Sequence, residues 1–195
     1  RVLKRIPMGA GLGGGSSDAA TVLVALNQLW GLGLATDQLA EIGLALGADV
    51  PVFVRGVAAW AEGVGERLAP VTLPEPWYAV IAPDALVPTA EIFAAPELVR
   101  NHPPITLEDY FNGAGSNDCA PVTCARYPAV AAALGWLSRA APARMSGTGC
   151  AVFAAFADER AARALQVASG CSQGADIRVL KRIPMGAGLG GGSSD

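Results

Sequence analysis

The chain has 195 residues, of which 52% are hydrophobic and only 16% are charged, so it can bury a substantial core and disorder is not expected. Its 14 basic and 17 acidic residues give a formal net charge of -3, which argues against a nucleic-acid partner but not against an anionic small substrate. The sequence has no signal peptide and no apolar run of membrane-spanning length, which predicts a cytoplasmic protein without a membrane partner.

The first part of the chain predicts mixed helices and strands around a glycine-rich segment that cannot be regular structure. Ser16, Ser17 and Asp18 offer N-cap side chains for the first helix. The expected elements are strands over residues 2–6, 50–54 and 57–61 and helices over residues 19–30 and 36–46.

The second part contains a loop-rich stretch over residues 83–121, rich in Pro and Asn, with one short helix near residues 89–93. A turn over residues 146–149, Ser-Gly-Thr-Gly, leads into a later strand. The other expected elements are strands over residues 77–82, 151–156 and 177–183, helices over residues 128–140 and 158–167, and a loop over residues 170–174.

Four cysteines are too few and too irregularly spaced for a disulfide framework in a chain of this length. Cys119 and Cys124 lack the second Cys or His pair that a zinc site needs, and His102 is the only histidine. We therefore expect free thiols in a reducing compartment and no metal held by protein ligands.

Residues 1–18 recur letter for letter as residues 178–195. Two terminal copies do not make a solenoid, in which neighbouring repeats stack, so the repeat indicates a rearranged reading frame more than evolved symmetry. A strand in the second copy is expected to take, or compete for, the sheet position of residues 2–7. Only the first copy is followed by a predicted helix in this sequence, so we expect that copy to bind phosphate better.

The glycine-rich segment lies between a predicted strand and a predicted helix. Its glycines let the backbone approach a ligand closely, and the first amides of a helix have no intrahelical partner. Together with the helix dipole, these amides form an anion site suited to a triphosphate. The expected nucleotide-binding residues are Pro7, Met8, Gly9, Ala10, Gly11, Leu12, Gly13, Gly14, Gly15, Ser16 and Ser17.

Three other interpretations of this segment are weaker. Gly9, Gly11 and Gly14 satisfy the dinucleotide pattern G-x-G-x-x-G, but no second strand ending in an acidic residue follows about 20 residues later. A Walker A loop needs a lysine that the segment lacks. A flexible linker would not lie between a strand and an amphipathic helix.

Residues 4–20, KRIPMGAGLGGGSSDAA, closely resemble the second signature of the GHMP kinases, the superfamily of galactokinase, homoserine kinase and mevalonate kinase. Residues 146–150, SGTGC, are similar to its third signature, a glycine turn near the nucleotide. The stretches LGADVPVF (46–53), AEGVGE (61–66) and SND (116–118) resemble the branch of this family that acts in non-mevalonate isoprenoid biosynthesis.

The resemblance implies an α+β, two-layer GHMP-kinase-like fold, truncated, with a ribosomal protein S5-like N-terminal half and a ferredoxin-like C-terminal half. It implies a partial N-terminal domain over residues 1–76, a C-terminal domain over residues 77–157 and a displaced upstream segment over residues 158–195. The family's N-terminal Pro-Ala-Lys-Leu-Asn-type strand and its C-terminal strand are not found in the sequence. We therefore expect little or no turnover from this chain.

The resemblance also implies the reaction. ATP, with Mg²⁺, would donate its γ-phosphate to a hydroxyl of the methylerythritol part of a cytidine-diphosphate-linked small molecule. The alternatives are an inactive nucleotide-binding fragment and a GHMP kinase for another alcohol.

The same resemblance assigns roles to four residues outside the loop. Asp49 matches the catalytic aspartate, Phe93 matches an aromatic residue that stacks on cytosine, and Thr89 and Val64 line the acceptor pocket. The residues alone favour plainer roles: a turn aspartate bonded to its own backbone for Asp49, and a core anchor for Phe93.

Overall fold

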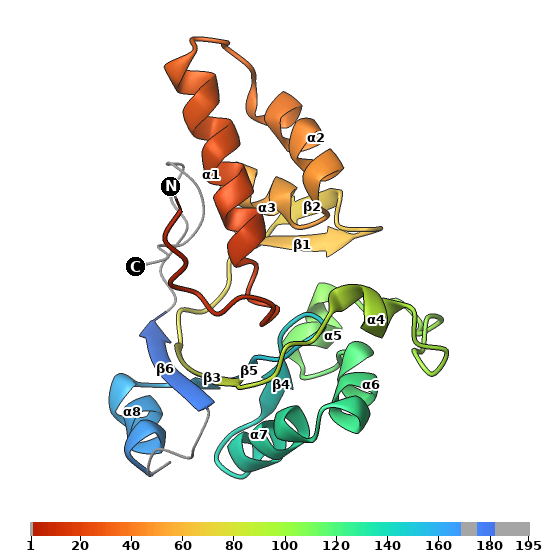
Figure 1. The fold of residues 1–195 in the computed structure, drawn as a ribbon, viewed down its shortest axis with the longest axis vertical. Helices are drawn as coiled ribbons and strands as arrows, with labels where there is room; N and C mark the ends of the chain where they lie inside the picture. Colours follow the sequence, from red (N-terminus) through yellow and green to blue (C-terminus); the bar gives the residue numbers. More distant parts are fainter. Residues whose placement is uncertain (1, 169–174, 182–195) are drawn as a thin grey trace. The chain divides into compact units, whose positions relative to one another are not determined.

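The structure is a computed structural model that describes residues 2–168 and 175–181 (Figure 1). The described residues form two compact units. Unit 1 holds residues 2–6 and 13–75, and unit 2 holds residues 7–12, 76–168 and 175–181. The expected loop over residues 170–174 and the end of the expected strand over residues 177–183 lie outside the described residues.

Unit 1 consists of three helices and an antiparallel hairpin. Its small core lies where the helices meet and contains Ala20, Leu39, Ala40, Val50 and Val54. The elements are α1 (Gly14–Leu29), α2 (Thr36–Leu46), α3 (Val50–Arg55), β1 (Ala59–Glu62) and β2 (Arg67–Pro70).

The two long helices of unit 1 confirm the sequence predictions, and α2 spans the predicted residues. The predicted strand over residues 50–54 is wrong, because this segment forms α3. Pro51 lies in the first turn of α3, where no N–H is needed, and Gly56 ends the helix with a φ of 64°. Val50 and Val54 are four residues apart and are both buried, so the apolar run fits a helix face as well as a strand.

The start of the chain also differs from the prediction. Residues 2–6 are described and contain no strand. Helix α1 begins at Gly14, and its N-cap is Gly13 rather than Ser16, Ser17 or Asp18. Ser16 and Ser17 therefore lie inside the first turn of α1.

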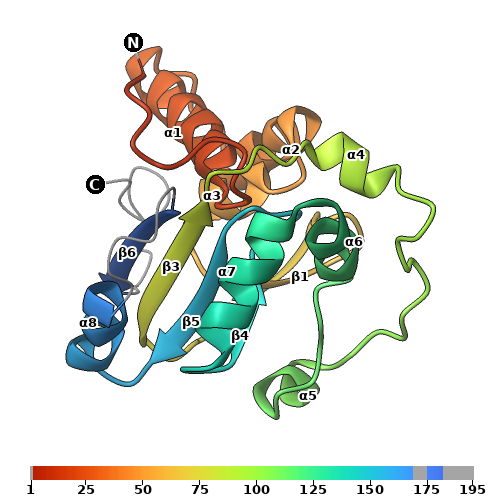
Figure 2. The same cartoon turned by 60° about the horizontal axis from the view of Figure 1, so that its bottom comes forward.

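Unit 2 is built on a four-stranded antiparallel sheet with the order β4-β5-β3-β6. Figure 2 shows α7 and α8 along one face of this sheet. The unit 2 elements are β3 (Trp77–Pro83), α4 (Thr89–Phe93), α5 (Leu107–Phe111), α6 (Cys119–Arg126), α7 (Pro128–Ser138), β4 (Ala143–Met145), β5 (Val152–Phe156), α8 (Glu159–Ala168) and β6 (Ala175–Lys181). The four strands, with α7 before β4 and α8 before β6, have the βαββαβ connectivity and strand order of a ferredoxin-like fold.

The sequence predicted β3, α4, α7, β5 and α8 close to their observed positions, but it missed α5, α6 and β4. Pro121 made the α6 segment look like a loop, yet it lies in the first turn of the helix, where a missing N–H breaks no bond. Strand β4 has only three residues, too few for a readable alternation.

Strand β6 is the fourth strand of the unit 2 sheet. It pairs with β3 from Ala175 opposite Pro83 to Lys181 opposite Trp77. Residues 2–6 form no strand, so the described residues show no competition between the copies, and whether β6 takes a sheet position meant for residues 2–7 stays a prediction. The edge of β3 offers unpaired backbone groups, and residues 175–181 satisfy them.

Candidate nucleotide and acceptor site

The end of the glycine-rich loop forms the N-terminus of α1 in unit 1. The first intrahelical hydrogen bond runs from the Ser17 N–H to the Gly13 carbonyl, with an N···O distance of 2.9 Å. The amides of Gly14, Gly15 and Ser16 precede that bond and so have no intrahelical acceptor. No acidic residue lies in the first turn, and a Cβ atom on Gly15 would have no neighbour within 4 Å. The positive end of the helix dipole is therefore open to an anion.

The first half of the loop packs within unit 2 against the turn over residues 146–149. The Ser146 hydroxyl donates to the Gly11 carbonyl at 2.6 Å, and the Ala151 N–H donates to the Ala10 carbonyl at 3.0 Å. Gly11 has a φ of 71°, and a Cβ atom there would lie 2.2 Å from the Ser146 carbonyl oxygen. Only glycine fits this approach. The two glycine-rich signatures, 135 residues apart at this contact, are thus hydrogen-bonded to each other.

Asn117 fixes the same turn from the N-terminal end of α6. Its side-chain amide donates to the Met145 carbonyl at 2.9 Å and to the Gly147 carbonyl at 2.7 Å, and its oxygen accepts from the Cys119 N–H at 2.9 Å. The sequence analysis gave Asn117 no role. The only signal was its place in the stretch SND, and the contact across about 30 residues is visible only in the fold.

Asp49 is the N-cap residue of α3, is exposed, and makes no capping hydrogen bond. The plainer interpretation of Asp49, a turn residue bonded to its own backbone, therefore lacks the contact that it requires. Phe53 lies one turn further along, on the same face of the helix. The Phe53 ring borders Gly13, where an added Cβ atom would lie 2.8 Å from the ring carbon Cζ. In unit 1, Asp49 and the helix end of the loop are thus on neighbouring surfaces.

Val64 lies at the tip of the turn between β1 and β2 and is 74% exposed. Its N–H donates to the Glu66 carboxylate at 2.7 Å. The N–H groups of Glu66 itself and of Val64 hold the pKa of the Glu66 carboxyl below its ordinary value. A Cβ atom on Gly65 would lie 3.0 Å from the carbonyl oxygen of Ala48, the residue before Asp49. The turn that carries Val64 is therefore next to Asp49.

Thr89 and Phe93 begin and end α4 in unit 2. The Thr89 hydroxyl lies 3.1 Å from the hydroxyl of Thr148 and so connects α4 to the turn over residues 146–149. Phe93 is 57% exposed, whereas its neighbour Ile92 is fully buried. The core-anchor interpretation of Phe93 is wrong, because Ile92 anchors this helix and the Phe93 ring is available for stacking.

The structure thus brings the predicted residues together in two groups. Residues 13–17, Asp49 and Val64 lie in unit 1, and residues 7–12, Thr89 and Phe93 lie in unit 2. Within the described ranges, no group of three or more His, Cys, Asp or Glu side chains could hold a metal ion. No helix in the described part of the chain is long and apolar enough to cross a bilayer.

Two protein-family models match the sequence. The model described as GHMP kinases N terminal domain matches residues 1–57 and 155–195, and the model described as GHMP kinases C terminal matches residues 96–174. The chain belongs to the GHMP kinase family. The N-terminal domain model thus includes the second copy of the repeat, even though β6 lies in the sheet of unit 2.

Curated GHMP kinases named 4-diphosphocytidyl-2-C-methyl-D-erythritol kinase are similar to this chain. The protein of Nitrosococcus oceani is 60% identical over 156 residues, which are 80% of this chain and 56% of that protein. The protein of Halorhodospira halophila is 55% identical over 186 residues, covering 93% of this chain and 65% of that protein. The chain therefore spans between 56% and 65% of the length of these relatives.

Solved structures of GHMP kinases resemble the fold. A crystal structure of 4-(cytidine 5′-diphospho)-2C-methyl-D-erythritol kinase has a TM-score of 0.72 and 35% identity, and the match covers 90% of this chain and 68% of that chain. A homoserine kinase from Cytophaga hutchinsonii has a TM-score of 0.60 at 19% identity, a likeness of fold alone.

Proposed function

We propose that this GHMP kinase chain binds ATP on the loop of residues 7–17 and, with the low turnover expected from its sequence, phosphorylates the methylerythritol hydroxyl of 4-diphosphocytidyl-2-C-methyl-D-erythritol in the cytoplasm. The observation that carries the proposal is the open N-terminus of α1, with three amides free of intrahelical bonds behind a loop that is hydrogen-bonded to the turn over residues 146–149. A helix of 16 residues presents roughly half a positive elementary charge at this end. The acceptor is taken from the names of the similar proteins.

The amides of Gly14, Gly15 and Ser16 would bind the phosphate oxygens, and the Ser16 and Ser17 hydroxyls supply further polar contacts. Because these donors are fixed by the helix, little reorganisation is needed as charge develops during transfer. Mg²⁺, when bound, would neutralise part of the negative charge that the phosphates carry during transfer. Of the protein groups in this segment, the Ser16 and Ser17 hydroxyls fit the preference of Mg²⁺ for oxygen ligands.

In the proposed reaction, the acceptor hydroxyl oxygen forms a bond to the γ-phosphorus, the bond from that phosphorus to the β–γ bridging oxygen breaks, and ADP leaves. The hydroxyl proton passes to the Asp49 carboxylate. An ordinary Asp carboxyl is a weak base at neutral pH, so orientation of the hydroxyl comes first and proton acceptance comes late. Val64 and Thr89 border the acceptor, and Phe93 stacks on its cytosine.

The proposal is tested by titrating the purified chain with a non-hydrolysable ATP analogue and with the acceptor, and by measuring phosphate transfer. We expect ATP-analogue binding with a Kd between about 1 µM and 1 mM, the usual range of substrate affinities. Asp49→Asn keeps that affinity and lowers whatever turnover the wild-type chain has by about a hundredfold or more. Glu41→Gln, at an exposed carboxylate of α2, is the matched control and changes neither quantity. A chain that binds neither ligand contradicts the proposal.

A further inference from the structure

Helix α4 is too short to hold its own conformation. It has five residues, and isolated helices below about 12 residues are marginal in water. Its first residue, Thr89, and its last, Phe93, are the two residues of unit 2 assigned to the acceptor. Ile92 fixes one face of the helix in the core, but the exposed Phe93 ring has no such anchor. Other contacts must therefore hold the C-terminal end of α4.

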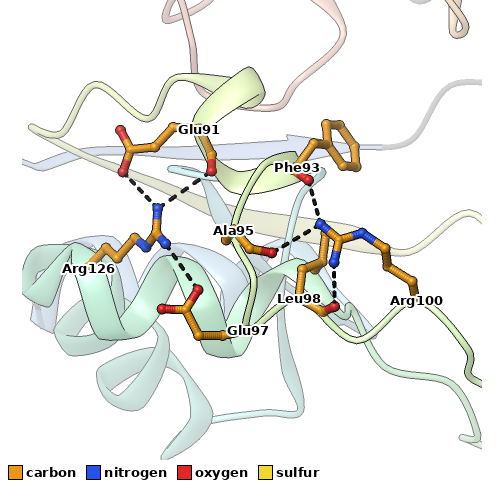
Figure 3. Close-up of polar contacts among 7 residues, drawn as sticks. All are labelled: Glu91, Phe93, Ala95, Glu97, Leu98, Arg100 and Arg126. Carbon is orange, nitrogen blue, oxygen red and sulfur yellow. Dashed lines mark hydrogen bonds and ion pairs between the residues drawn. The ribbon is translucent and has the colours of Figure 1, made fainter.

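Arg100 supplies those contacts. Its Nη2 group donates to the Phe93 carbonyl at 2.7 Å and to the Ala95 carbonyl at 3.0 Å, and its Nη1 group donates to the Leu98 carbonyl at 3.0 Å (Figure 3). The last carbonyls of a helix have no intrahelical donor and form the negative end of its dipole. A planar guanidinium with five N–H donors can satisfy several of them at once, and its charge strengthens each bond.

We infer that Arg100 is a positioning residue for the acceptor: by holding the carbonyl of Phe93, it fixes the backbone from which the aromatic ring projects. A ring fixed before binding does not lose its freedom when a pyrimidine base stacks on it, so affinity is higher. The inference rests on the proposed function, because the ligand is the cytosine of the proposed acceptor. Arg100 itself contacts neither the base nor the phosphates in this assignment.

Arg126 holds the same segment in a different way and provides a matched control. It pairs with the carboxylates of Glu91 at 3.3 Å and Glu97 at 3.1 Å, and its contact with the Glu91 carbonyl is long, at 3.5 Å (Figure 3). These carboxylates are exposed, so water and salt weaken the ion pairs. Loss of Arg126 removes mainly side-chain pairs, whereas loss of Arg100 leaves the Phe93 carbonyl at the end of α4 without its donor and the Ala95 carbonyl with only the Leu98 N–H, at 3.2 Å.

The test measures the affinity of Arg100→Met, Arg100→Lys, Arg126→Met and Phe93→Ala for 4-diphosphocytidyl-2-C-methyl-D-erythritol and for a non-hydrolysable ATP analogue. We expect Arg100→Met to weaken acceptor binding about tenfold, as befits the loss of charge-assisted hydrogen bonds, and to leave ATP-analogue binding within twofold. Arg100→Lys, which keeps the positive charge but not the planar set of N–H donors, gives an intermediate loss of acceptor affinity. Arg126→Met changes both affinities less than twofold.

The decisive comparison is the double variant. Because Arg100 acts through the Phe93 ring, Arg100→Met in the Phe93→Ala background weakens acceptor binding by less than twofold. Amide hydrogen exchange at Ala94, which bonds to the Ala90 carbonyl at 2.9 Å, also becomes faster in Arg100→Met and not in Arg126→Met.

Several results would overturn the inference. Additive losses in the double variant, equal losses for the acceptor and the ATP analogue, or unchanged acceptor binding in both Arg100 variants each exclude a role through Phe93. If Arg100→Met does not fold, Arg100→Lys decides by the same criteria. If the wild-type chain binds the ATP analogue but not the acceptor, the acceptor assignment fails together with Arg100, whereas a chain that binds neither overturns the proposed function itself.

Discussion

The two copies of the terminal repeat have the same sequence and different structures where both are described. Residues 2–4 and residues 179–181 both read Val-Leu-Lys, yet the first set has no regular structure and the second belongs to β6. Val2 and Leu3 are 60% and 72% exposed, while Val179 is half-buried beside β3. Lys4, in the first copy, forms an ion pair with Asp18 instead of a sheet contact.

The difference teaches that the available partner, and not the tripeptide, decides whether a strand forms. Strand propensity depends strongly on neighbours, and β3 offers an open edge to the second copy. Residues 175–177, which precede the repeat, also pair with β3 and extend the register. The first copy continues instead into a loop that is hydrogen-bonded to the turn over residues 146–149 and into α1. The same tripeptide is thus part of a sheet in the second copy and has no regular structure in the first.

The largest expected effect is on nucleotide affinity, and it distinguishes the first copy of the repeat from the second. Gly11→Val places a side chain 2.2 Å from the Ser146 carbonyl oxygen and at a positive φ, so we expect ATP-analogue affinity to fall by about a hundredfold or more. Gly188→Val makes the same change at the equivalent residue of the second copy and leaves affinity unchanged. Calorimetric titration of both variants checks this, and an equal loss in the two would give the second copy an equal part in binding.

A smaller effect is expected at the turn over residues 146–149, to which the loop of the first copy is hydrogen-bonded. Asn117→Ala removes the donor for the Met145 and Gly147 carbonyls. We expect a loss of about 1–3 kcal/mol in the free energy of unfolding and weaker ATP-analogue binding. Asn101→Ala, at an exposed asparagine of the same unit, is the control and changes neither quantity. Unchanged nucleotide affinity in Asn117→Ala would mean that the turn over residues 146–149 does not support nucleotide binding by the loop.

The smallest expected effect is on the free energy of unfolding, and it compares residues 2–4 with the equivalent residues of β6. Val179→Asp puts a charge at a half-buried position of β6 and is expected to lower the free energy of unfolding by about 1–2 kcal/mol. Val2→Asp, the equivalent change at an exposed position without regular structure, lowers it by less than about 0.5 kcal/mol. Urea unfolding of the two variants gives both values. Equal losses would mean that residues 2–4 are packed as closely as β6.

Many elements of the fold, and the candidate loop, could be predicted from the sequence, because helix-ending glycines and helical periodicity are local signals. They placed α2 from Thr36 to Leu46 and marked residues 7–17 as a candidate loop. The failures were decided by distant contacts. The apolar run of α3 fits a strand or a helix until its packing is known, and the partner of β6 lies about 100 residues away. Asn117 was missed for the same reason, because its side-chain amide donates to two carbonyls about 30 residues further along the chain.

The central claim is that the free amides at the start of α1, in the first copy, bind the polyphosphate of a nucleotide. Amide chemical-shift changes on titration with a non-hydrolysable ATP analogue test it directly, because they report each copy separately. We expect the largest changes at Gly14, Gly15 and Ser16, with residues 185–194 unaffected. Largest changes at residues 185–194, or saturating binding that leaves the amides of Gly14, Gly15 and Ser16 unmoved, would contradict the claim.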